Sequence, residues 1–238
     1  MSITGPVIFL QARMNSSRLP GKSLYLINDY PVVVLAALRA QNTGRKVSVL
    51  TSTNDSDNKL ANVVSSYRIS TYRGDLNNVL ERFVTALEQY SDNTIVVRLT
   101  ADNIFPDGSL IDETLEYFER SNLNYLACNG EYSGIPYGVS LEITYAKHLR
   151  DSLLNTDDPN DLEHVTPFII RKYGKSFYSH YMYLNFGHLR STIDTKEDFD
   201  RICNVFLSLP TNTDVVTVSW KKLVQVLNKV SQSNNIDF

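Results

Sequence analysis

The chain has 238 residues, of which 42% are hydrophobic and 21% are charged, and its formal net charge is -3. This length and composition are ordinary for a globular protein, and we expect a single domain over residues 1–238. The small negative charge excludes a dominant basic face, which argues against nucleic acid as the main partner.

Simple patterns also argue against a membrane protein and against disulfide bonds. No apolar stretch approaches the roughly 18 residues needed to cross a bilayer. The chain opens without the basic and apolar segments of a signal peptide. Cys128 and Cys203 lie far apart in apolar contexts and lack metal-ligand spacing, so we expect buried free thiols. Together these features predict a cytoplasmic protein.

Strand and helix patterns alternate over the first half of the chain. In chain order we predict strand 7–10, helix 31–41, strand 46–51, helix 57–67, strand 68–72, helix 77–90, strand 94–99 and helix 109–121. Strands separated by helices predict right-handed βαβ units, and hence an α/β fold with a mostly parallel central sheet flanked by helices. In open sheets of this kind, ligands bind at the carboxyl ends of the strands.

The second half is less regular. A loop rich in Gly, Tyr and Pro covers residues 129–137, and an alternating aromatic and polar run at 176–184 predicts a half-exposed strand. Residues 189–194 are predicted to form a strand that leads into a helix. The other predictions are strands at 125–128 and 139–144 and helices at 146–154, 162–173, 195–207 and 219–230.

The most informative stretch is residues 11–22, Gln-Ala-Arg-Met-Asn-Ser-Ser-Arg-Leu-Pro-Gly-Lys, directly after the first predicted strand. Its small residues let the backbone approach an anion, and its cations (Arg13, Arg18 and Lys22) can neutralise a polyphosphate. The spacing matches neither a Walker loop nor Gly-x-Gly-x-x-Gly. The alternative is a solvated basic turn. The order Arg-Leu-Pro-Gly-Lys favours a loop that aims charge inward, because Pro20 fixes one φ angle and Gly21 permits a tight turn.

Two aspartates are candidates for a Mg²⁺ site. Asp102 follows the strand 94–99, and a carboxylate at the tip of a strand is well placed to bind Mg²⁺ that faces a nucleotide. Asp194 precedes the helix 195–207 and could supply a second carboxylate. The alternative for each is a structural role, as a helix cap or loop anchor for Asp102 and as an N-cap for Asp194.

Four further features have both a functional and a structural interpretation. Glu163 and His164 lie on a helix, where His164 is either structural or faces a substrate. Glu142 alternates out of an apolar strand, toward a cleft or toward solvent. Arg73-Gly74-Asp75 ends the third strand, either as a turn or as a wall of a base or ribose pocket. No Ser-His-Asp or Cys-His arrangement is visible, so covalent catalysis has no candidate.

Several of these stretches together resemble the cytidylyltransferase family. They resemble in particular its branch typified by spore coat polysaccharide biosynthesis protein F, which is similar to the acylneuraminate and 3-deoxy-manno-octulosonate cytidylyltransferases. The stretch 11–22 is the most specific match. The others follow in family order, Tyr-Arg-Gly-Asp at 72–75, Val-Leu-Glu-Arg at 79–82, Val-Arg-Leu-Thr-Ala-Asp at 97–102, Glu-His-Val-Thr-Pro at 163–167 and Leu-Arg-Ser-Thr-Ile-Asp-Thr at 189–195.

The resemblance implies a Rossmann-like nucleotide-diphosphosugar transferase fold and a CTP-dependent reaction. An acid sugar of the nonulosonic or octulosonic type would attack the α-phosphorus of CTP and release pyrophosphate, for surface polysaccharide biosynthesis. The resemblance also implies a homodimer. We expect residues 129–185 to form an excursion that shapes the acceptor pocket or the dimer contact.

The resemblance also assigns roles to individual residues of this chain. Arg13, Arg18 and Lys22 would hold the triphosphate and act in catalysis, and Asp102 and Asp194 would bind the Mg²⁺ cofactor. The other expected nucleotide contacts are Leu10, Gln11, Ala12, Ser17, Arg73, Asp75, Thr100 and Ala101. The expected acceptor contacts are Arg98, Tyr137, Glu142, Glu163, His164 and Arg190.

Three departures from the family pattern concern the acceptor more than CTP. The family usually has Cys-Pro where this chain has Asn103-Ile104, often has Asp where this chain has Ser140, and often has Arg where this chain has Leu162. Two alternatives therefore stay open. One is a nucleotidyltransferase of the same fold that acts on a sugar phosphate or a phosphonate, and the other is a nucleotide-binding relative without turnover.

Overall fold

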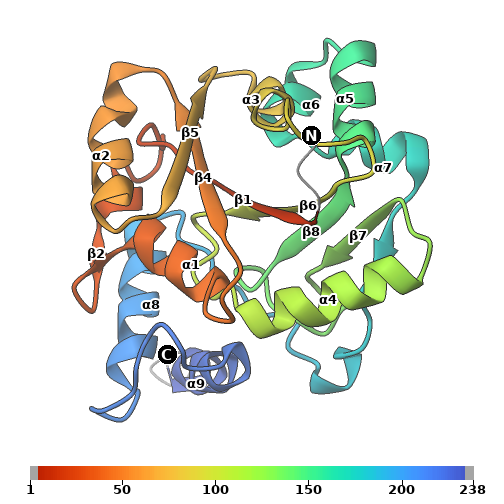
Figure 1. The fold of residues 1–238 in the computed structure, drawn as a ribbon. Coiled ribbons are helices and arrows are strands. Elements are labelled where there is room, and N and C mark those ends of the chain that lie inside the picture. Colours follow the sequence, from red (N-terminus) through yellow and green to blue (C-terminus); the bar gives the residue numbers. More distant parts are fainter. Residues whose placement is uncertain (1–4, 234–238) are drawn as a thin grey trace.

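The computed structural model describes residues 5–233, and a seven-stranded sheet crosses its centre (Figure 1). The strand order is β5-β4-β1-β6-β8-β7-β9. Strands β1, β4, β5 and β6 are parallel, whereas β8 runs antiparallel to β6 and β7, so the predicted mostly parallel sheet is confirmed. The strands are β1 (Val7–Gln11), β4 (Val47–Ser52), β5 (Ser70–Gly74), β6 (Ile95–Thr100), β7 (Tyr125–Cys128), β8 (Leu141–Tyr145) and β9 (Ser176–Phe177).

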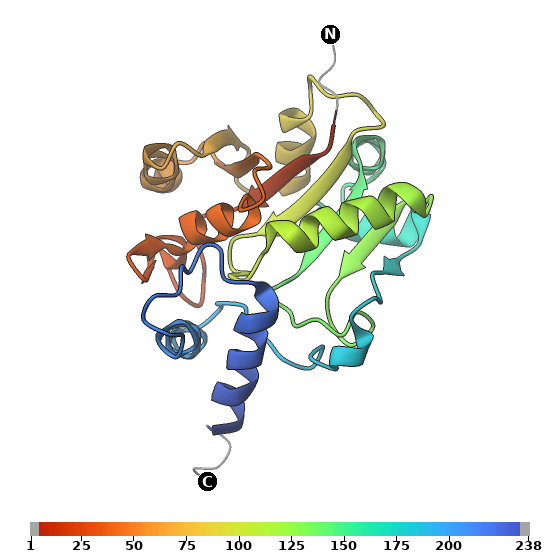
Figure 2. The same ribbon diagram turned by 60° about the horizontal axis from the view of Figure 1, so that its bottom comes forward.

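Helices cover both faces of the sheet (Figures 1 and 2). One group packs into the larger apolar cluster and comprises α1 (Val32–Ala40), α2 (Asn58–Ser66), α4 (Gly108–Arg120), α8 (Lys196–Leu207) and α9 (Trp220–Ser233). The other group packs into the smaller cluster and comprises α3 (Val79–Ala86), α5 (Ala146–Asn155), α6 (Pro159–His164) and α7 (Pro167–Tyr173). Within residues 5–233, no helix is long and apolar enough to span a membrane.

Alternation along the central strands explains why both faces need a cover. In β1, Ile8 and Leu10 point into the larger cluster, whereas Phe9 points into the smaller one. The same alternation holds in β6, where Val97 and Val96 belong to different clusters. Successive side chains of a strand point to opposite faces, so a central strand that is apolar throughout must be buried on both sides.

The sheet has its topological switch point beside β1. From β1 the chain moves outward through β4 to β5, and then returns to pair β6 with the other side of β1. The last residue of β1, Gln11, pairs with Thr100, the last residue of β6. The loops that follow these two strands therefore start side by side at the carboxyl edge, where open α/β sheets bind ligands.

Two predictions for the second half were wrong. The single helix predicted at 162–173 is divided into α6 and α7, because Val165 adopts φ +72° and Pro167 begins the second helix. The strand predicted at 176–184 is reduced to β9, followed by a 3-10 turn at Met182–Leu184. This part of the chain folds back onto Gly134, whose carbonyl accepts a hydrogen bond from the Phe186 N–H at 3.1 Å.

The strand predicted at 189–194 is present only as two isolated bridges. Arg190 pairs with Tyr137, and Thr192 pairs with Asn103. The Ile193 N–H also donates to the Asp102 carbonyl at 2.9 Å. The segment thus crosses the ends of the sheet, and it carries Asp194 to the carboxyl end of β6.

A small hairpin of β2 (Leu26–Ile27) and β3 (Tyr30–Pro31) lies outside the main sheet and has no counterpart among the predicted elements. Its two-residue turn consists of Asn28 and Asp29, with φ angles of +46° and +66°. These are residue types that tolerate the left-handed region that such turns require. The hairpin connects the loop after β1 to helix α1.

Candidate active site

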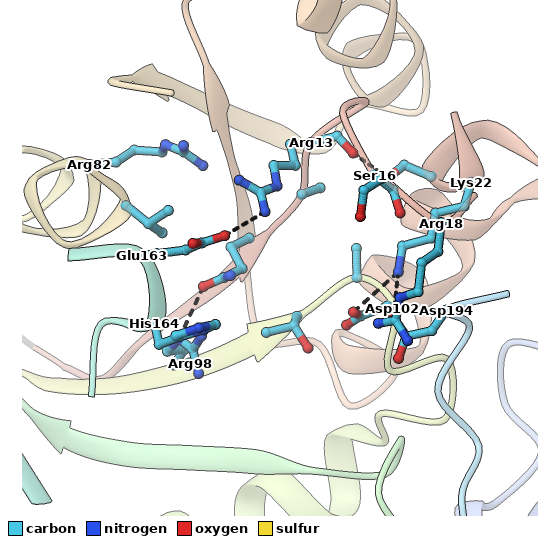
Figure 3. Close-up of a pocket in the computed structure, with 17 residues that line it drawn as sticks. Arg13, Ser16, Arg18, Lys22, Arg82, Arg98, Asp102, Glu163, His164 and Asp194 are labelled. Atoms are coloured by element: carbon cyan, nitrogen blue, oxygen red, sulfur yellow. Dashed lines mark hydrogen bonds and ion pairs between the residues drawn. The ribbon is translucent and has the colours of Figure 1, made fainter. Parts of the chain in front are cut away.

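A cleft of about 330 Å³ opens at the carboxyl ends of β1 and β6 (Figure 3). Its walls come from the loop after β1, the loop after β6, α3, α6 and the segment before α8. The lining residues are Gln11, Ala12, Arg13, Ser16, Ser17, Arg18, Lys22, Ser23, Val79, Arg82, Arg98, Thr100, Ala101, Asp102, Glu163, His164 and Asp194.

The loop after β1 owes its shape to a tight turn around Met14. The Met14 carbonyl accepts hydrogen bonds from the backbone N–H groups of Ser16 and Gly21, both at 3.0 Å. Gly21 has φ +75°, in the left-handed region that favours glycine, and it starts the 3-10 turn at Lys22–Leu24. The turn directs the Lys22 side chain into the cleft (Figure 3), so the loop does aim charge inward.

Lys22 joins the two candidate metal ligands. Its Nζ atom lies 3.0 Å from Asp194 Oδ1 and 3.4 Å from Asp102 Oδ2, and it donates to the Ile193 carbonyl at 2.6 Å. The side chain is only 13% exposed. Two carboxylates and one ammonium group therefore meet at the cationic end of the cleft, although they come from three distant parts of the sequence.

Neither aspartate caps a helix, which was the structural alternative for Asp194 and one of the two for Asp102. Helix α4 is capped by Asp107, whose carboxylate accepts from the Ser109 N–H. Helix α8 is capped by Thr195, which forms a capping box with Asp198. The side chains of Asp102 and Asp194 are thus left to face the cleft.

Asp194 is surrounded by cations. Besides Lys22, its carboxylate contacts Arg18 Nη2 at 3.1 Å and forms an ion pair with Arg190. Burial alone would raise the pKa of Asp194, but the hydrogen bonds and charges of Lys22, Arg190 and Arg18 together hold that pKa below its usual range. Three cations face two carboxylates here, so this end of the cleft has an excess of positive charge that suits an anionic ligand.

Arg13 lies at the other side of the cleft, where it reaches across to helix α6. Its Nη2 atom lies 2.7 Å from Glu163 Oε1, and the two side chains are 41% and 46% exposed. Exposed ion pairs of this kind contribute about 0.2–1 kcal/mol. The contact is therefore weak enough for a ligand to replace it.

A second cavity, of about 480 Å³, adjoins the cleft on the β8 side. The two share Arg98, Thr100, Asp102, His164 and Asp194, and the second cavity adds Asn103, Asn129, Tyr137, Ser140, Leu141, Glu142, Arg190 and Thr192. Thr192 Oγ1 is buried without a hydrogen-bond partner among the described residues. A buried hydroxyl without a partner is costly, and a ligand in this cavity could satisfy it.

Arg98 stands between the two cavities and is held on both sides. It forms an ion pair with Glu142, the residue opposite it on β8, and its Nε donates to Gln11 Oε1 at 3.0 Å. Glu142 also accepts hydrogen bonds from the hydroxyls of Tyr125 and Thr166. Glu142 therefore faces the second cavity rather than solvent, and it orients the arginine.

This network predicts how stability depends on pH. Burial alone would raise the pKa of Glu142, but the Arg98 charge and the hydrogen bonds from Tyr125, Arg98 and Thr166 hold it below the unfolded value of about 4.3. The stabilisation is therefore complete above that value and is lost as the pH falls through the lower folded pKa. We expect the melting temperature of the wild type to exceed that of Glu142→Gln at pH 7, and the gap to close below about pH 4. A gap that persists unchanged to pH 3 would contradict this.

Most of the expected site residues line the cleft or the second cavity. Leu10 does not, because its side chain is fully buried in the larger apolar cluster. Arg73 and Asp75 also lie outside both cavities formed by residues 5–233. Arg73 Nε donates to the Ser52 carbonyl at 2.8 Å, and Asp75 accepts from the backbone N–H groups of Asn77 and Asn78. The sequence left open whether Asp75 belongs to a turn or to the wall of a pocket, and these hydrogen bonds show the turn.

The cleft also contains an arginine that the sequence analysis did not assign. Arg82 on α3 is 1% exposed, and its Nε and Nη2 atoms donate to the Asp75 carbonyl at 2.9 and 2.6 Å. Burial lowers its pKa, although nearby carboxylates oppose the shift. The stretch Val-Leu-Glu-Arg at 79–82 could have pointed to Arg82. Residues one turn apart lie on the same face of a helix, and Val79 and Arg82 both line the cleft.

A cationic loop after the first strand, opposite two aspartates at the switch point of an α/β sheet, is the arrangement of a nucleotidyltransferase. Comparison with known protein families makes this specific, because the family model described as Cytidylyltransferase matches residues 7–214. The chain belongs to the cytidylyltransferase family, as the resemblance in the sequence had suggested.

Two individual relatives are similar to this chain over nearly its whole length. The chain is 30% identical to an uncharacterized protein of Methanocaldococcus jannaschii over 233 residues, which cover 96% of this chain and 92% of the relative. It is 28% identical to the spore coat polysaccharide biosynthesis protein SpsF of Bacillus subtilis over 235 residues, 94% of each chain.

Solved structures show the same fold. A cytidylyltransferase from Leptospira borgpetersenii superposes with a TM-score of 0.83 at 25% identity, covering 95% of this chain and 94% of that one. The CMP:2-keto-3-deoxy-manno-octonic acid synthetase, whose structure is a complex with CTP, superposes with a TM-score of 0.61 at 17% identity. That match covers 86% of this chain and 99% of the synthetase.

Proposed function

We propose that this cytidylyltransferase uses CTP to activate an acid sugar of the nonulosonic or octulosonic type, with release of pyrophosphate, for surface polysaccharide biosynthesis. The observation that carries the proposal is the meeting of Lys22, Asp102 and Asp194 at the end of a cationic loop. The relatives add support, because one is a CMP–acid sugar synthetase solved with CTP and another is a spore coat polysaccharide biosynthesis protein.

The charges of the cleft set the orientation of the nucleotide. The triphosphate lies at the cationic end, against Ser16, Ser17, Arg18 and Lys22, where backbone N–H groups and cations neutralise its oxygens. Arg13, which the resemblance also assigned to the triphosphate, lies instead on the other side of the cleft, beside Glu163 (Figure 3). The base then lies toward Arg82, at the other end of the cleft (Figure 3). Transfer of the nucleotidyl group needs in-line geometry and charge stabilisation more than covalent help.

The donor set at the cationic end fits Mg²⁺. Asp102 and Asp194 point their oxygens at one ammonium group, which shows that both can face a single cation. No cluster of three or more His, Cys, Asp or Glu side chains within residues 5–233 could hold a metal. Mg²⁺ typically takes one or two carboxylates together with substrate phosphates and water, so these two aspartates would hold it with the nucleotide. When bound, the ion would neutralise charge on the phosphate oxygens.

The second cavity is where we place the acceptor. Arg190 and Arg98 supply positive charge, and Tyr137, His164 and Thr192 supply polar groups that could contact hydroxyls. Both arginines form ion pairs, Arg98 with Glu142 and Arg190 with Asp194, but Arg98 is 14% exposed and Arg190 is 53% exposed. The greater exposure favours Arg190 as the group that meets the carboxylate of the sugar. The cavity adjoins the cleft at Asp102, so an acceptor there lies beside the proposed metal ligands.

Thermal unfolding tests nucleotide use directly. With Mg²⁺ present, CTP at about 100 times its Kd should add about 2.7 kcal/mol to the free energy of unfolding. That corresponds to a rise of roughly 5–10 °C in melting temperature for a chain of this size. We expect smaller shifts with UTP, ATP and GTP, and with CTP in the presence of a chelator. Equal shifts with all four nucleotides would contradict selectivity for CTP, and the absence of any shift would contradict the function.

The acceptor is identified by pyrophosphate release. The enzyme, Mg²⁺ and CTP are incubated with nonulosonic acids, octulosonic acids and phosphorylated sugars, and the released pyrophosphate is measured. Release with an acid sugar alone supports the proposal. Release only with a phosphorylated sugar would overturn the acid-sugar part and leave the nucleotidyltransferase.

We further propose that the enzyme is a cytoplasmic homodimer. Exposed aromatic and apolar side chains gather in residues 129–185, namely Tyr132, Tyr137, Met182 and Tyr183, and such residues are enriched in interfaces between subunits. Both cysteines are unpaired, which suits a reducing compartment.

A further inference from the structure

One buried carboxylate next to the cleft has no role in the chemistry proposed above. Asp57 ends the 3-10 turn Asp55–Asp57 before helix α2, and it is fully buried. It forms no ion pair within the described part of the chain and does not line the cleft. Charged side chains are rarely buried without a purpose, because burial is costly unless hydrogen bonds compensate.

The hydrogen bonds of Asp57 join the loop after β1 to the neighbouring strand β4. Its Oδ1 atom accepts from the Met14 N–H at 2.7 Å. Its Oδ2 atom accepts from the Ser52 N–H at 3.1 Å and from the Ser52 hydroxyl. Met14 belongs to the loop after β1 and Ser52 is the last residue of β4. One carboxylate thus ties the anion-binding loop to the neighbouring strand.

Met14 connects Asp57 to the residues that face the ligand, through hydrogen bonds of its backbone. Its N–H donates to Asp57, and its carbonyl accepts from the backbone N–H groups of Ser16 and Gly21. The Ser16 side chain lines the cleft, and Gly21 starts the turn that places Lys22. The path from Asp57 to Lys22 therefore consists of hydrogen bonds to backbone groups at fixed positions.

Asp57 also acts on Arg82, the buried cation at the far end of the cleft. Among the nearby charges, that of Asp57 does most to counteract the fall in the Arg82 pKa caused by burial. Arg73 joins the same assembly, because it donates to the carbonyl of Ser52. Arg73, which the sequence had placed in the nucleotide pocket, thus stabilises the end of β4 beside the loop.

We propose that Asp57 is a positioning residue for the triphosphate of the nucleotide, a role that rests on the proposed function. It holds the loop after β1 in the conformation that receives phosphate before any ligand arrives, so that binding does not have to order the loop. Without this anchor, Met14 and the turn that depends on it can adopt other conformations. Affinity for a triphosphate then falls more than affinity for a monophosphate, which meets less of the loop.

The test compares Asp57→Asn with a matched control, Asp107→Asn. An asparagine at 57 keeps one acceptor oxygen but presents an NH₂ group to donors that previously met a carboxylate, so at least one hydrogen bond is lost. Asp107 is also buried, and it likewise accepts from two backbone N–H groups and one serine hydroxyl, those of Ser109 and Trp220. It lies in addition 4.0 Å from the buried Arg39, so its replacement should cost at least as much stability as that of Asp57. It does not line the cleft.

Calorimetric titration with CTP and with CMP, both with Mg²⁺, gives the decisive measurement. We expect Asp57→Asn to raise the Kd of CTP at least about tenfold and the Kd of CMP less than about threefold. We expect Asp107→Asn to lower the melting temperature but to leave both Kd values within about twofold of the wild type. A general loss of stability would not change the ratio of the two Kd values, whereas a loop that no longer receives phosphate would.

Several outcomes would overturn the proposal. These are a wild-type Kd for CTP in Asp57→Asn, an equal loss for CTP and CMP, or an equal loss in Asp107→Asn. If Asp57→Asn does not fold, Ser52→Ala decides, because it removes one of the three donors and should raise the Kd of CTP by about threefold. An unchanged Kd in that variant would also overturn the proposal. If the wild type binds no CTP, the proposed function itself has failed.

Discussion

Replacing Lys22 by alanine is expected to lower kcat/KM for pyrophosphate release by about 10²- to 10³-fold, or roughly 3–4 kcal/mol of transition-state stabilisation. The reason is the position of its ammonium group. It is largely buried, lies within 3.4 Å of both aspartates, and faces the end of the cleft where the triphosphate is placed. Negative charge that develops on the leaving pyrophosphate would lose a fixed cation whose side chain is only 13% exposed.

The measurement is the initial rate of pyrophosphate release with CTP, Mg²⁺ and the acceptor that supports wild-type turnover. Lys196→Ala is the control, because Lys196 is an exposed lysine that also pairs with an aspartate, Asp200, and neither residue lines the cleft. We expect Lys196→Ala to retain normal kcat/KM. Near-normal turnover of Lys22→Ala would remove Lys22 from the catalytic assignment.

Asparagine at 102 or at 194 is expected to produce the second large effect, with two different signatures. Each variant loses one of the two proposed Mg²⁺ ligands, so we expect kcat/KM to fall by at least about 10²-fold and the Mg²⁺ requirement to rise. Asp194→Asn should in addition lower the melting temperature without Mg²⁺, because Lys22, Arg18 and Arg190 would be left without their shared carboxylate. Asp102 has one cationic neighbour, so its replacement should cost less stability.

Rates at increasing Mg²⁺ concentrations separate these signatures from a general defect. Asp200→Asn is the matched control, because it removes an exposed aspartate from a lysine pair on α8. We expect its Mg²⁺ dependence to equal that of the wild type. If Asp102→Asn and Asp194→Asn both show wild-type Mg²⁺ dependence, the two aspartates are not the metal ligands.

The first half of the fold could be predicted because its signals are local. Apolar strands and amphipathic helices alternate from β1 to α4, and each predicted element is present with small shifts at its ends. The second half depended on contacts between distant segments. Val165 takes a positive φ angle that breaks the predicted helix. Only residues 176–177 extend the sheet, as β9, and the chain after them folds back onto the loop at 130–134.

The candidate site shows the same division. The loop at 11–22 and the carboxylates Asp102 and Asp194 were found from residue types and strand ends, together with the family resemblance. Arg82 was missed because an arginine on an amphipathic helix usually faces solvent, and only the carbonyls of Asp75 and Leu76 turn it toward the cleft. Arg73 was expected in the pocket, but the carbonyls of Ser52 and Asn54 hold it outside.

The sequence by itself determined the α/β class, the family and the cationic loop, because these depend on periodicity and on contiguous motifs. Only the tertiary structure decided that Asp194 meets Asp102 and Lys22, and that Thr195 rather than Asp194 caps α8. The physical reason is that the crossing segment 189–194 pairs with Tyr137 and Asn103 through backbone hydrogen bonds. Nearly every residue type carries the same backbone donor and acceptor, so pairing of this kind cannot be predicted from the residue types in the segment.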